Sequence, residues 1–262
     1  MITTILIGFV LLFSMMAFLW LVSMRISNAA VVDVGWGAGF FLFAGIAYAL
    51  TRGGEPRTIL LAAMVMLWSG RLALHLLRDR VLSGSPEDER YSEIRRRWKS
   101  HLNLKFFLFF QLQAVLIAVL SIPMLIVMEN PAPGLSIFEW SGILLWLAAL
   151  IGEAEADRQL ALFKRNPENK GKVCQSGLWN YSRHPNYFFE WLVWVTYFVF
   201  ALGSPYGWLS IGGPVIMFVI LTRLTGIPLT EEHALRSRGE AYRAYQKSTS
   251  PFVPWMKRRA RS

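Results

Sequence analysis

The sequence is poor in the residues that build disulfide frameworks and metal centres. Its 262 residues include one cysteine, Cys174, and four histidines. A single cysteine excludes a disulfide framework, a thiolate zinc cluster and an iron–sulfur site, and the scattered histidines do not have metal-ligand spacing. The sequence also lacks a P-loop, a nucleophile elbow and a helix with paired histidines. We therefore expect no metal ion in the functional site.

Charged residues are scarce as well. They make up 17% of the chain, whereas soluble domains usually carry about a quarter. Hydrophobic residues account for 54%, and the mean hydropathy is +0.39. The charge balance is basic, with 27 Lys and Arg against 17 Asp and Glu. This combination indicates a membrane protein whose basic loops face anionic lipid or an anionic cofactor.

Seven apolar runs are long enough to cross a bilayer, since about 20 helical residues span its hydrocarbon core. They cover about 2–24, 29–50, 58–77, 106–128, 137–161, 187–203 and 207–227. An amphipathic helical pattern follows over about 230–246, with Thr230 as its expected N-cap. The sequence therefore predicts an all-α, polytopic membrane protein with seven transmembrane helices and an amphipathic C-terminal helix at the cytoplasmic surface.

Lysine and arginine concentrate in three segments, at about 78–105, 164–183 and 236–261. Basic loops remain in the cytoplasm, so an odd number of spans places all three segments, and the C-terminus, on that side. The sequence contains no internal repeat or linker that would mark a second domain. We expect one multi-pass domain in the inner or plasma membrane.

Ionisable residues within membrane spans are costly and therefore mark functional candidates. Asp33 lies in the second predicted span, Arg71 in the third and Arg223 near the end of the seventh. A purely structural alternative is a pair between Asp33 and Arg71, because charges in membranes usually pair. The alternative for Arg223 is that its side chain extends to the lipid headgroups.

Three glycines, Gly35, Gly37 and Gly39, lie in the same span as Asp33. A dinucleotide fingerprint would require a preceding strand, which a membrane helix does not provide. Small residues that allow close helix packing explain the three glycines better.

The densest polar and aromatic cluster spans residues 177–190, with the sequence Gly-Leu-Trp-Asn-Tyr-Ser-Arg-His-Pro-Asn-Tyr-Phe-Phe-Glu. Pro185 suits a first helical turn, so we expect the sixth span to begin there. A helix N-terminus beside Arg183 suits a phosphate or carboxylate group. Asn186 and Glu190 share a helix face and can bind an amide or a ribose hydroxyl. The structural alternative is a well-capped turn at an aromatic belt.

This segment resembles the cofactor motif of the membrane steroid 5α-reductase family. The resemblance rests on Gly177-Leu178, Tyr181, Asn186 and Glu190, while residues 183–187 match the bacterial, DUF1295-type members. It extends back to Asp157, at the position of a family aspartate that contacts NADPH. It also continues forward to Tyr242 and to the Pro-Phe-Val-Pro sequence at 251–254.

The resemblance implies an NADPH-dependent oxidoreductase of the 3-oxo-5α-steroid 4-dehydrogenase type. Such an enzyme transfers a hydride to the carbon–carbon double bond of an enone lipid, for example a 3-oxo-4-ene steroid. Residues 1–262 would form a single reductase-like domain, with substrate-side helices over about 1–128 and a cofactor-side region over about 137–256.

The same resemblance implies the functional residues. The expected catalytic residues are Asp33, a buried carboxyl that keeps its proton and donates a hydrogen bond to the substrate carbonyl, and Trp68, at the position of a family tyrosine. The expected cofactor-binding residues are Arg71, Arg90, Tyr91, Asp157, Lys164, Trp179, Tyr181, Arg183, His184, Asn186, Tyr187, Glu190 and Arg223.

Two other hypotheses remain open. Isoprenylcysteine and phospholipid methyltransferases of membranes also carry an Arg-His-Pro-x-Tyr turn and a later Glu-Glu pair, as at Glu231-Glu232, and bind S-adenosylmethionine with them. The additional N-terminal spans and the basic loop favour the reductase, because the phosphates of NADPH require several cations. The third hypothesis is a non-enzymatic lipid-binding protein. The expected partners are the bilayer and a small apolar lipid or steroid, with no nucleic acid, and the sequence indicates no known protein partner.

Overall fold

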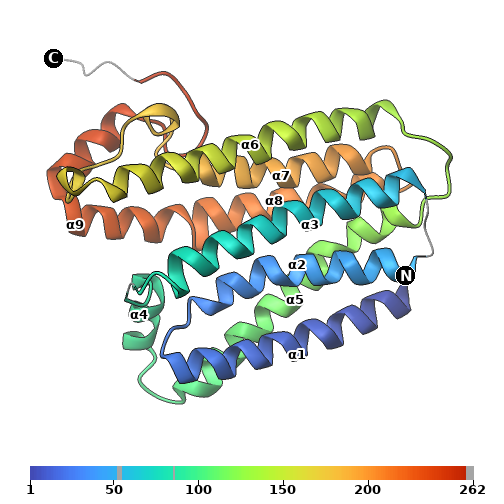
Figure 1. Ribbon diagram of the computed structural model, residues 1–262, viewed down its shortest axis with the longest axis horizontal. Helices are drawn as coiled ribbons and strands as arrows, with labels where there is room; N and C mark the ends of the chain where they lie inside the picture. The colour runs from blue at the N-terminus through green and yellow to red at the C-terminus, as the bar shows by residue number, and fades with distance from the viewer. Residues whose placement is uncertain (52–54, 85, 258–262) are drawn as a thin grey trace. The chain divides into compact units, whose positions relative to one another are not determined.

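The computed structural model describes residues 1–51, 55–84 and 86–257 (Figure 1). These described residues form helices and no β-strand, and six segments among them are long and apolar enough to cross a membrane. The predicted class, an all-α multi-pass membrane protein, is therefore confirmed. The chain divides into two compact units, one comprising residues 1–137 and 201–209 and the other residues 138–200 and 210–262.

The first unit is built on long apolar helices, which are α1 (Ile2–Ile26), α2 (Val31–Leu50), α3 (Pro56–Leu76) and α5 (Leu102–Met128). Helix α2 packs against the other three. A Cβ added at Gly37 would lie 2.9 Å from the Ser69 carbonyl oxygen of α3, and one added at Gly39 would lie 2.6 Å from the Ile117 side chain of α5. The predicted role of these glycines in close helix packing is confirmed.

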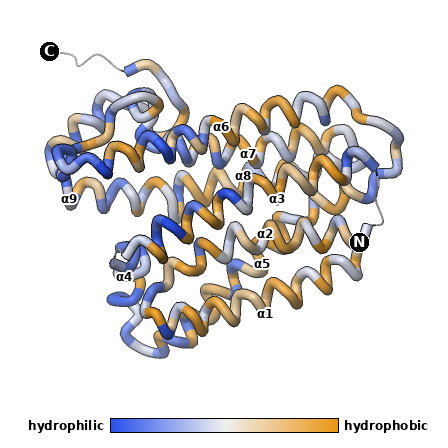
Figure 2. Tube along the Cα trace, in the orientation of Figure 1, coloured by the Kyte–Doolittle hydropathy of each residue, from blue (hydrophilic) through white to orange (hydrophobic). Residues whose placement is uncertain are grey.

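Two short elements interrupt this bundle after α3. A π-helical turn, η1 (Leu77–Val81), ends α3, and a loop leads to the short helix α4 (Glu89–Arg97). Figure 2 shows that α4 is mostly hydrophilic, whereas α1 and α5 are mostly hydrophobic. The charged part of the first unit is thus concentrated where η1 and α4 meet the start of α2.

The second unit begins with α6 (Ile137–Arg165) and continues through the 3₁₀ turns η2 (Pro167–Asn169) and η3 (Gly177–Asn180). It then contains α7 (Pro185–Ala201), α8 (Gly212–Val219), the π-helical turn η5 (Ile220–Leu224) and α9 (Ile227–Ser248). The 3₁₀ turn η4 (Gly207–Ile211) spans the boundary between the units. Helix α7 starts at Pro185, as predicted.

The predicted number of spans, seven, is not confirmed by the described residues. Helix α7 has 17 residues, which is at the lower limit for a crossing. The six candidate spans of the described residues therefore do not confirm the seven that the sequence predicts. One of the six candidate spans is the stretch Gly207–Ser248, of 42 residues. The sequence instead predicts a span over about 207–227 and a separate amphipathic helix over about 230–246.

The expected start of the last helix is wrong. Helix α9 begins at Ile227, with Gly226 as its N-cap, and Thr230 lies inside the helix and donates to the Gly226 carbonyl oxygen at 3.0 Å. The bend before α9 requires glycine at position 226, because an added Cβ would lie 2.4 Å from the Leu221 carbonyl oxygen. Backbone crowding of this kind cannot be read from hydrophobic periodicity.

Candidate functional sites

Asp33, in the first turn of α2, accepts hydrogen bonds from three side chains. Its Oδ1 accepts from the Tyr91 hydroxyl at 2.6 Å, and its Oδ2 accepts from the Arg90 guanidinium at 3.0 Å and from Arg80. The side chains of Asp33 and Arg90 are 19% exposed and that of Arg80 is 23% exposed. We name the group formed by Asp33, Arg80, Asp88, Arg90 and Tyr91 the Asp33 cluster.

Local structure brings these groups to Asp33. The turn η1 carries Arg80, and Asp88 is the N-cap of α4. The Asp88 carboxylate accepts from the Arg90 backbone N–H at 3.0 Å and from its Nε at 2.9 Å. An N-cap aspartate satisfies a backbone N–H that the helix leaves free. Asp88 therefore both begins α4 and orients Arg90 toward Asp33.

Burial and neighbouring charges shift the pKa values in α4 and at its cap. Burial and the charge of Asp33 raise the pKa of Tyr91 well above its ordinary value. Burial alone would raise the pKa of Asp88, but hydrogen bonds from Arg90 and its charge hold that pKa at about 2. Burial alone would lower the pKa of Arg90, yet the charge of Asp33 raises it well above normal. At neutral pH the Tyr91 hydroxyl therefore keeps its proton and Asp88 remains an anion.

Hydrogen bonds to the backbone tie the loop before α2 to the same region. The Asn28 side-chain amide donates to the Arg80 carbonyl oxygen at 3.0 Å. The Ala29 N–H donates to the Glu87 carboxylate at 2.7 Å, and Glu87 in turn pairs with Arg95 at 2.9 Å. These contacts position the backbone on both sides of the cluster.

The second candidate site is the turn that precedes α7. The Trp179 indole donates to the Ala156 carbonyl oxygen of α6 at 3.0 Å, and the Tyr245 hydroxyl of α9 donates to the Trp179 carbonyl oxygen. Gly177 has a φ of +57°, and a Cβ added there would lie 2.4 Å from the Gln159 Oε1. The positive φ therefore favours glycine at position 177, and a larger residue would also displace the Gln159 side chain. The turn is held between α6 and α9.

Arg183 is the centre of a polar network in this turn, and its side chain is 8% exposed. Its Nε donates to Glu231 at 2.6 Å, and its Nη1 donates to the carbonyl oxygens of Gln246 at 3.1 Å and Thr249 at 2.6 Å. The His184 Nε2 lies 3.3 Å from the same Glu231 oxygen. Burial lowers the pKa of His184 even beside this carboxylate. We name Arg183, His184, Glu231 and Gln246 the Arg183 cluster.

Two residues of the predicted cofactor-binding set meet beside this cluster. The Asn186 side-chain amide donates to the Asp157 carboxylate at 3.3 Å, although 29 positions separate them. The His184 and Tyr187 rings are stacked, with centroids 5.4 Å apart and an interplanar angle of 8°. The Tyr187 hydroxyl lies 3.2 Å from the Thr230 hydroxyl of α9. The second unit thus gathers hydrogen-bonding groups and aromatic rings around the start of α7.

The remaining predicted site residues lie outside the Asp33 and Arg183 clusters. Glu190 is 8% exposed and accepts from the Trp194 indole at 3.4 Å. Trp68 is fully buried, with its ring centroid 5.7 Å from that of Phe40, and belongs to the core of the first unit. Arg71 lies on α3. Exposed positions are held by Lys164 at the end of α6, Tyr181 in the turn and Arg223 in η5.

The position of Asp33 in the network differs from the expected one. The sequence predicts a protonated carboxyl that donates to a substrate carbonyl, or else a structural pair with Arg71. In the structure both oxygens of Asp33 accept hydrogen bonds, and its cationic partners are Arg80 and Arg90. The uncharged donor in this cluster is the Tyr91 hydroxyl, which donates to Asp33 Oδ1 at 2.6 Å.

Sequence reasoning missed Arg80, Asp88 and Gln246 as members of the two clusters. A signal for Asp88 was present, because an aspartate two positions before Arg90 at the start of a charged helical run is an N-cap pattern. Arg80 lies 47 positions from Asp33 in a loop rich in arginine. Gln246 is likewise 63 positions from Arg183. No local pattern selects either residue.

The fold and the clusters define an all-helical, multi-pass membrane protein with charged groups largely buried in both units. A family model described as a protein of unknown function (DUF1295) matches residues 19–249, and the chain belongs to this family. The chain is also similar to the uncharacterized protein C594.04c of Schizosaccharomyces pombe, with 26% identity over 284 aligned positions. That alignment covers 95% of this chain and 79% of the yeast protein. Both clusters lie within the region that the family model matches.

Proposed function

We propose that the protein is a membrane-embedded reductase that uses NADPH to reduce the carbon–carbon double bond of an enone lipid of the 3-oxo-4-ene steroid type. The observation that carries this proposal is the hydrogen bond between Asp157 and Asn186. The resemblance to membrane steroid 5α-reductases assigns both positions to NADPH. Membership of the DUF1295 family supports the proposal, because the resemblance includes the DUF1295-type members.

The side chains beside this hydrogen bond fit a dinucleotide. A carboxylate accepts from ribose hydroxyls, and an amide both donates and accepts, so Asp157 and Asn186 suit ribose or carboxamide groups. The Tyr187 ring offers a flat surface next to them. Lys164 supplies an exposed cation for a phosphate, whereas Arg183 already donates to three acceptors within the protein. NADPH, when bound, supplies a hydride, and these residues orient it.

The Asp33 cluster supplies the proton donor in this proposal. Steroid reductases hold the substrate ketone with a carboxylate and a tyrosine, and the tyrosine beside Asp33 is Tyr91 at 2.6 Å, not a residue at the Trp68 position. The Tyr91 hydroxyl, which donates to Asp33 in the structure, would turn to the enolate oxygen that develops on the substrate and transfer its proton there, and water would return a proton to the phenolate. Asp33 orients the hydroxyl, and Arg80 and Arg90 hold Asp33.

We also propose that α7 is a seventh crossing and that α9 lies at the cytoplasmic surface. The three basic segments support this orientation, because lysine and arginine are retained in the cytoplasm. In a Cys174→Ser background, Lys99→Cys should react with an impermeant thiol reagent only from the cytoplasmic side, and Tyr206→Cys only from the opposite side. Labelling of both positions from the same side would contradict seven crossings.

Nucleotide binding by the detergent-purified protein tests the cofactor. NADPH should raise Tm more than NADH or S-adenosylmethionine does. Asn186→Ala should weaken NADPH binding by about 1–3 kcal/mol, the cost of leaving a buried polar partner unpaired. Asn103→Ala, at an exposed position of α5, is the matched control and should bind as the parent does. Equal NADPH affinity in the two variants would remove Asn186 from the cofactor site.

An S-adenosylmethionine-dependent membrane methyltransferase of the isoprenylcysteine or phospholipid type is the second candidate. The observation that favours it is the pairing of Glu231 with Arg183 at 2.6 Å and with His184 at 3.3 Å, because both parts of that signature meet there. A Tm gain with S-adenosylmethionine and none with NADPH would select this activity. A response to lipid alone would select a non-enzymatic lipid-binding protein.

A further inference from the structure

Residues 249–257 follow α9 and are fixed against the turn before α7. The Trp255 N–H donates to the Tyr181 carbonyl oxygen at 2.9 Å, and the Ser182 hydroxyl donates to the Phe252 carbonyl oxygen at 2.7 Å. The Phe252 ring is 6% exposed and packs against the aromatic rings of α7 and α8. Both the backbone and one buried ring therefore hold this segment in place.

The fixed segment nevertheless exposes large apolar side chains. Trp255 is 71% exposed, Met256 is 80% exposed and Val253 is 49% exposed. Apolar side chains gathered on an ordered backbone indicate a surface that another molecule covers. Tryptophan is enriched where a membrane protein meets the headgroup region, because its ring is apolar and its N–H is polar.

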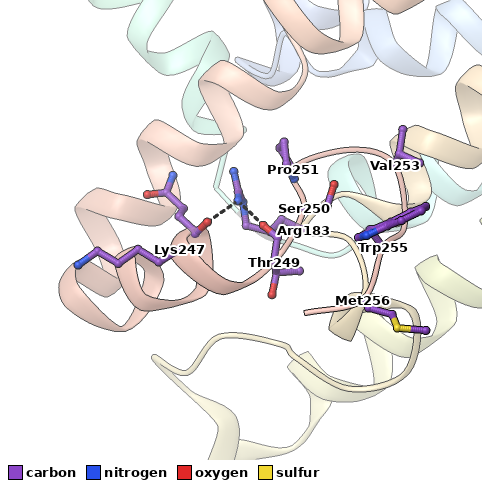
Figure 3. Close-up of a pocket in the computed structure, with 9 residues that line it drawn as sticks. Arg183, Lys247, Thr249, Ser250, Pro251, Val253, Trp255 and Met256 are labelled. Atoms are coloured by element: carbon purple, nitrogen blue, oxygen red, sulfur yellow. Dashed lines mark hydrogen bonds between the residues drawn. The ribbon is translucent and has the colours of Figure 1, made fainter. Parts of the chain in front are cut away.

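A pocket of about 310 Å³ lies beside these side chains (Figure 3). Its polar wall includes Arg183, Lys247 and Thr249, and its apolar wall includes Val253, Trp255 and Met256. Arg183 donates to backbone carbonyl oxygens at this wall, as the dashed lines in Figure 3 mark, and its charge is partly balanced by Glu231. The pocket is thus cationic on one side and apolar on the other.

The cation available to a ligand is Lys247. Its side chain is exposed, and within the described part of the chain it has no carboxylate partner. Lys257, at the end of the same segment, donates to the Gln175 side-chain oxygen at 3.0 Å. The charge of Lys247 is complementary to an anion that also presents apolar surface.

We propose that this pocket binds the headgroup of an anionic phospholipid of the surrounding bilayer. The phosphate lies against Lys247 and the Arg183 wall, and the glycerol and first acyl carbons contact Trp255 and Met256. Charge complementarity selects an anionic lipid over a zwitterionic one, since basic residues next to a membrane attract anionic headgroups. The apolar wall selects a lipid over free phosphate, which would leave Trp255 and Met256 uncovered.

Lipid binding to the full-length, detergent-purified protein tests the proposal. Native mass spectrometry with dioleoylphosphatidylglycerol should show one preferentially bound lipid, and dioleoylphosphatidylcholine should bind more weakly. Lys247→Gln should bind phosphatidylglycerol about fivefold more weakly, the effect of one cation at a lipid surface. Trp255→Ser should bind about tenfold more weakly, because it removes most of the apolar wall.

Two control variants match these changes. Arg243→Gln removes a cation one turn earlier on α9, and Trp208→Ser removes a tryptophan that is 62% exposed and far from the pocket in the sequence. Both should bind phosphatidylglycerol as the parent does. Equal lipid affinity in Lys247→Gln and Arg243→Gln, or equal binding of the two phospholipids by the parent, would overturn the proposal.

Competition distinguishes the lipid from other sources of phosphate. Neither NADPH nor inorganic phosphate should displace bound phosphatidylglycerol, and the Tm gain with NADPH should be the same in Lys247→Gln and the parent. Displacement by NADPH, together with loss of that Tm gain in Lys247→Gln, would assign the pocket to the nucleotide and overturn the lipid site. Because lipid and nucleotide are measured separately, failure of the lipid site leaves the reductase proposal standing.

Discussion

The two units bury charge in opposite ways. In the first unit the centre is an anion, Asp33, which accepts from two guanidinium groups and a phenol. In the second unit the centre is a cation, Arg183, which donates to one carboxylate and to two backbone carbonyl oxygens. The arginines around Asp33 are about a fifth exposed, whereas Arg183 is 8% exposed.

Arg183 therefore binds mainly backbone atoms, whereas the Asp33 carboxylate accepts from side chains. The carbonyl oxygens that accept from Arg183 belong to Gln246, at the end of α9, and to Thr249, the residue after α9. If the guanidinium is lost, these oxygens lose the hydrogen bonds that it donates. The arginines of the Asp33 cluster are closer to solvent and can exchange a protein partner for water or an anionic ligand. We therefore expect stability to depend more on Arg183 and activity to depend more on the Asp33 cluster.

The largest effect should follow from Arg183→Met. This change removes the guanidinium from Glu231, which keeps the hydrogen bond from Gln246 at 2.8 Å, and from two carbonyl oxygens. Breaking a buried ion pair costs about 3–5 kcal/mol. Equilibrium unfolding in mixed micelles measures the loss. Arg243→Met, which removes an exposed cation from α9, is the control and should cost less than about 1 kcal/mol. A loss in Arg183→Met no larger than in the control would contradict the backbone role of Arg183.

Asp33→Leu should cost less, about 2–4 kcal/mol, because Arg80 and Arg90 are left without a carboxylate but keep some contact with water. Asp33→Asn keeps an acceptor and should cost about half as much while it lowers turnover. Asp79→Asn, at an exposed position in η1, is the control for loss of a charge. Tm and turnover are measured on the same preparations. If Asp33→Leu unfolds at the same Tm as the parent, the Asp33 cluster does not stabilise the fold.

Tyr91→Phe should reduce stability by only about 1–2 kcal/mol, the cost of one buried hydrogen bond to a charged acceptor. If Tyr91 is the proton donor, turnover should decrease about 10²–10⁴-fold while NADPH affinity is unchanged. Steady-state assays with an enone lipid and nucleotide titrations separate the two effects. A parallel loss of NADPH affinity would place Tyr91 in the cofactor site instead.

The smallest effect concerns pH and His184. Its pKa in the folded state is below the ordinary value of 6.5, so the folded protein takes up this proton less readily than the unfolded chain does. The contribution of neutral His184 to stability is therefore complete above about pH 6.5 and decreases as the pH falls toward the folded-state pKa. Tm should fall between pH 7 and pH 5 by less in His184→Gln than in the parent. His233→Gln, an exposed histidine of α9, should behave as the parent does.

The main helices could be predicted from the sequence because their signal is local. The apolar runs at about 2–24, 29–50 and 137–161 correspond to α1, α2 and the larger part of α6. Pro185 marks the start of α7 for the same reason, because proline suits the first turn of a helix through its own fixed φ and missing N–H. The bend at Gly226 could not be predicted, because it depends on the approach of the Leu221 carbonyl oxygen.

Residues of the candidate sites could be predicted only where they belong to a recognisable sequence motif. The resemblance selected Asp157 and Asn186, and the structure places them 3.3 Å apart. It did not indicate that Asp33 is held by Arg80, because many arginines in the basic loop were equivalent in the sequence. Which of them reaches Asp33 depends on the π-helical turn η1, and this geometry has no signature in residue type.

The contacts of residues 249–257 with the turn before α7 also have a consequence for the order of synthesis. A ribosome completes the turn at residues 177–187 about seventy residues before it adds Trp255, whose N–H binds the Tyr181 carbonyl oxygen. Until then the turn cannot form this bond, the parallel bridge between Ser182 and Ser250, or the contact between Arg183 and Thr249. Contacts so distant in sequence form slowly. The nascent chain therefore lacks these three contacts while α7 and α8 enter the membrane, and the site is completed only after α9 and residues 249–257 have been synthesised.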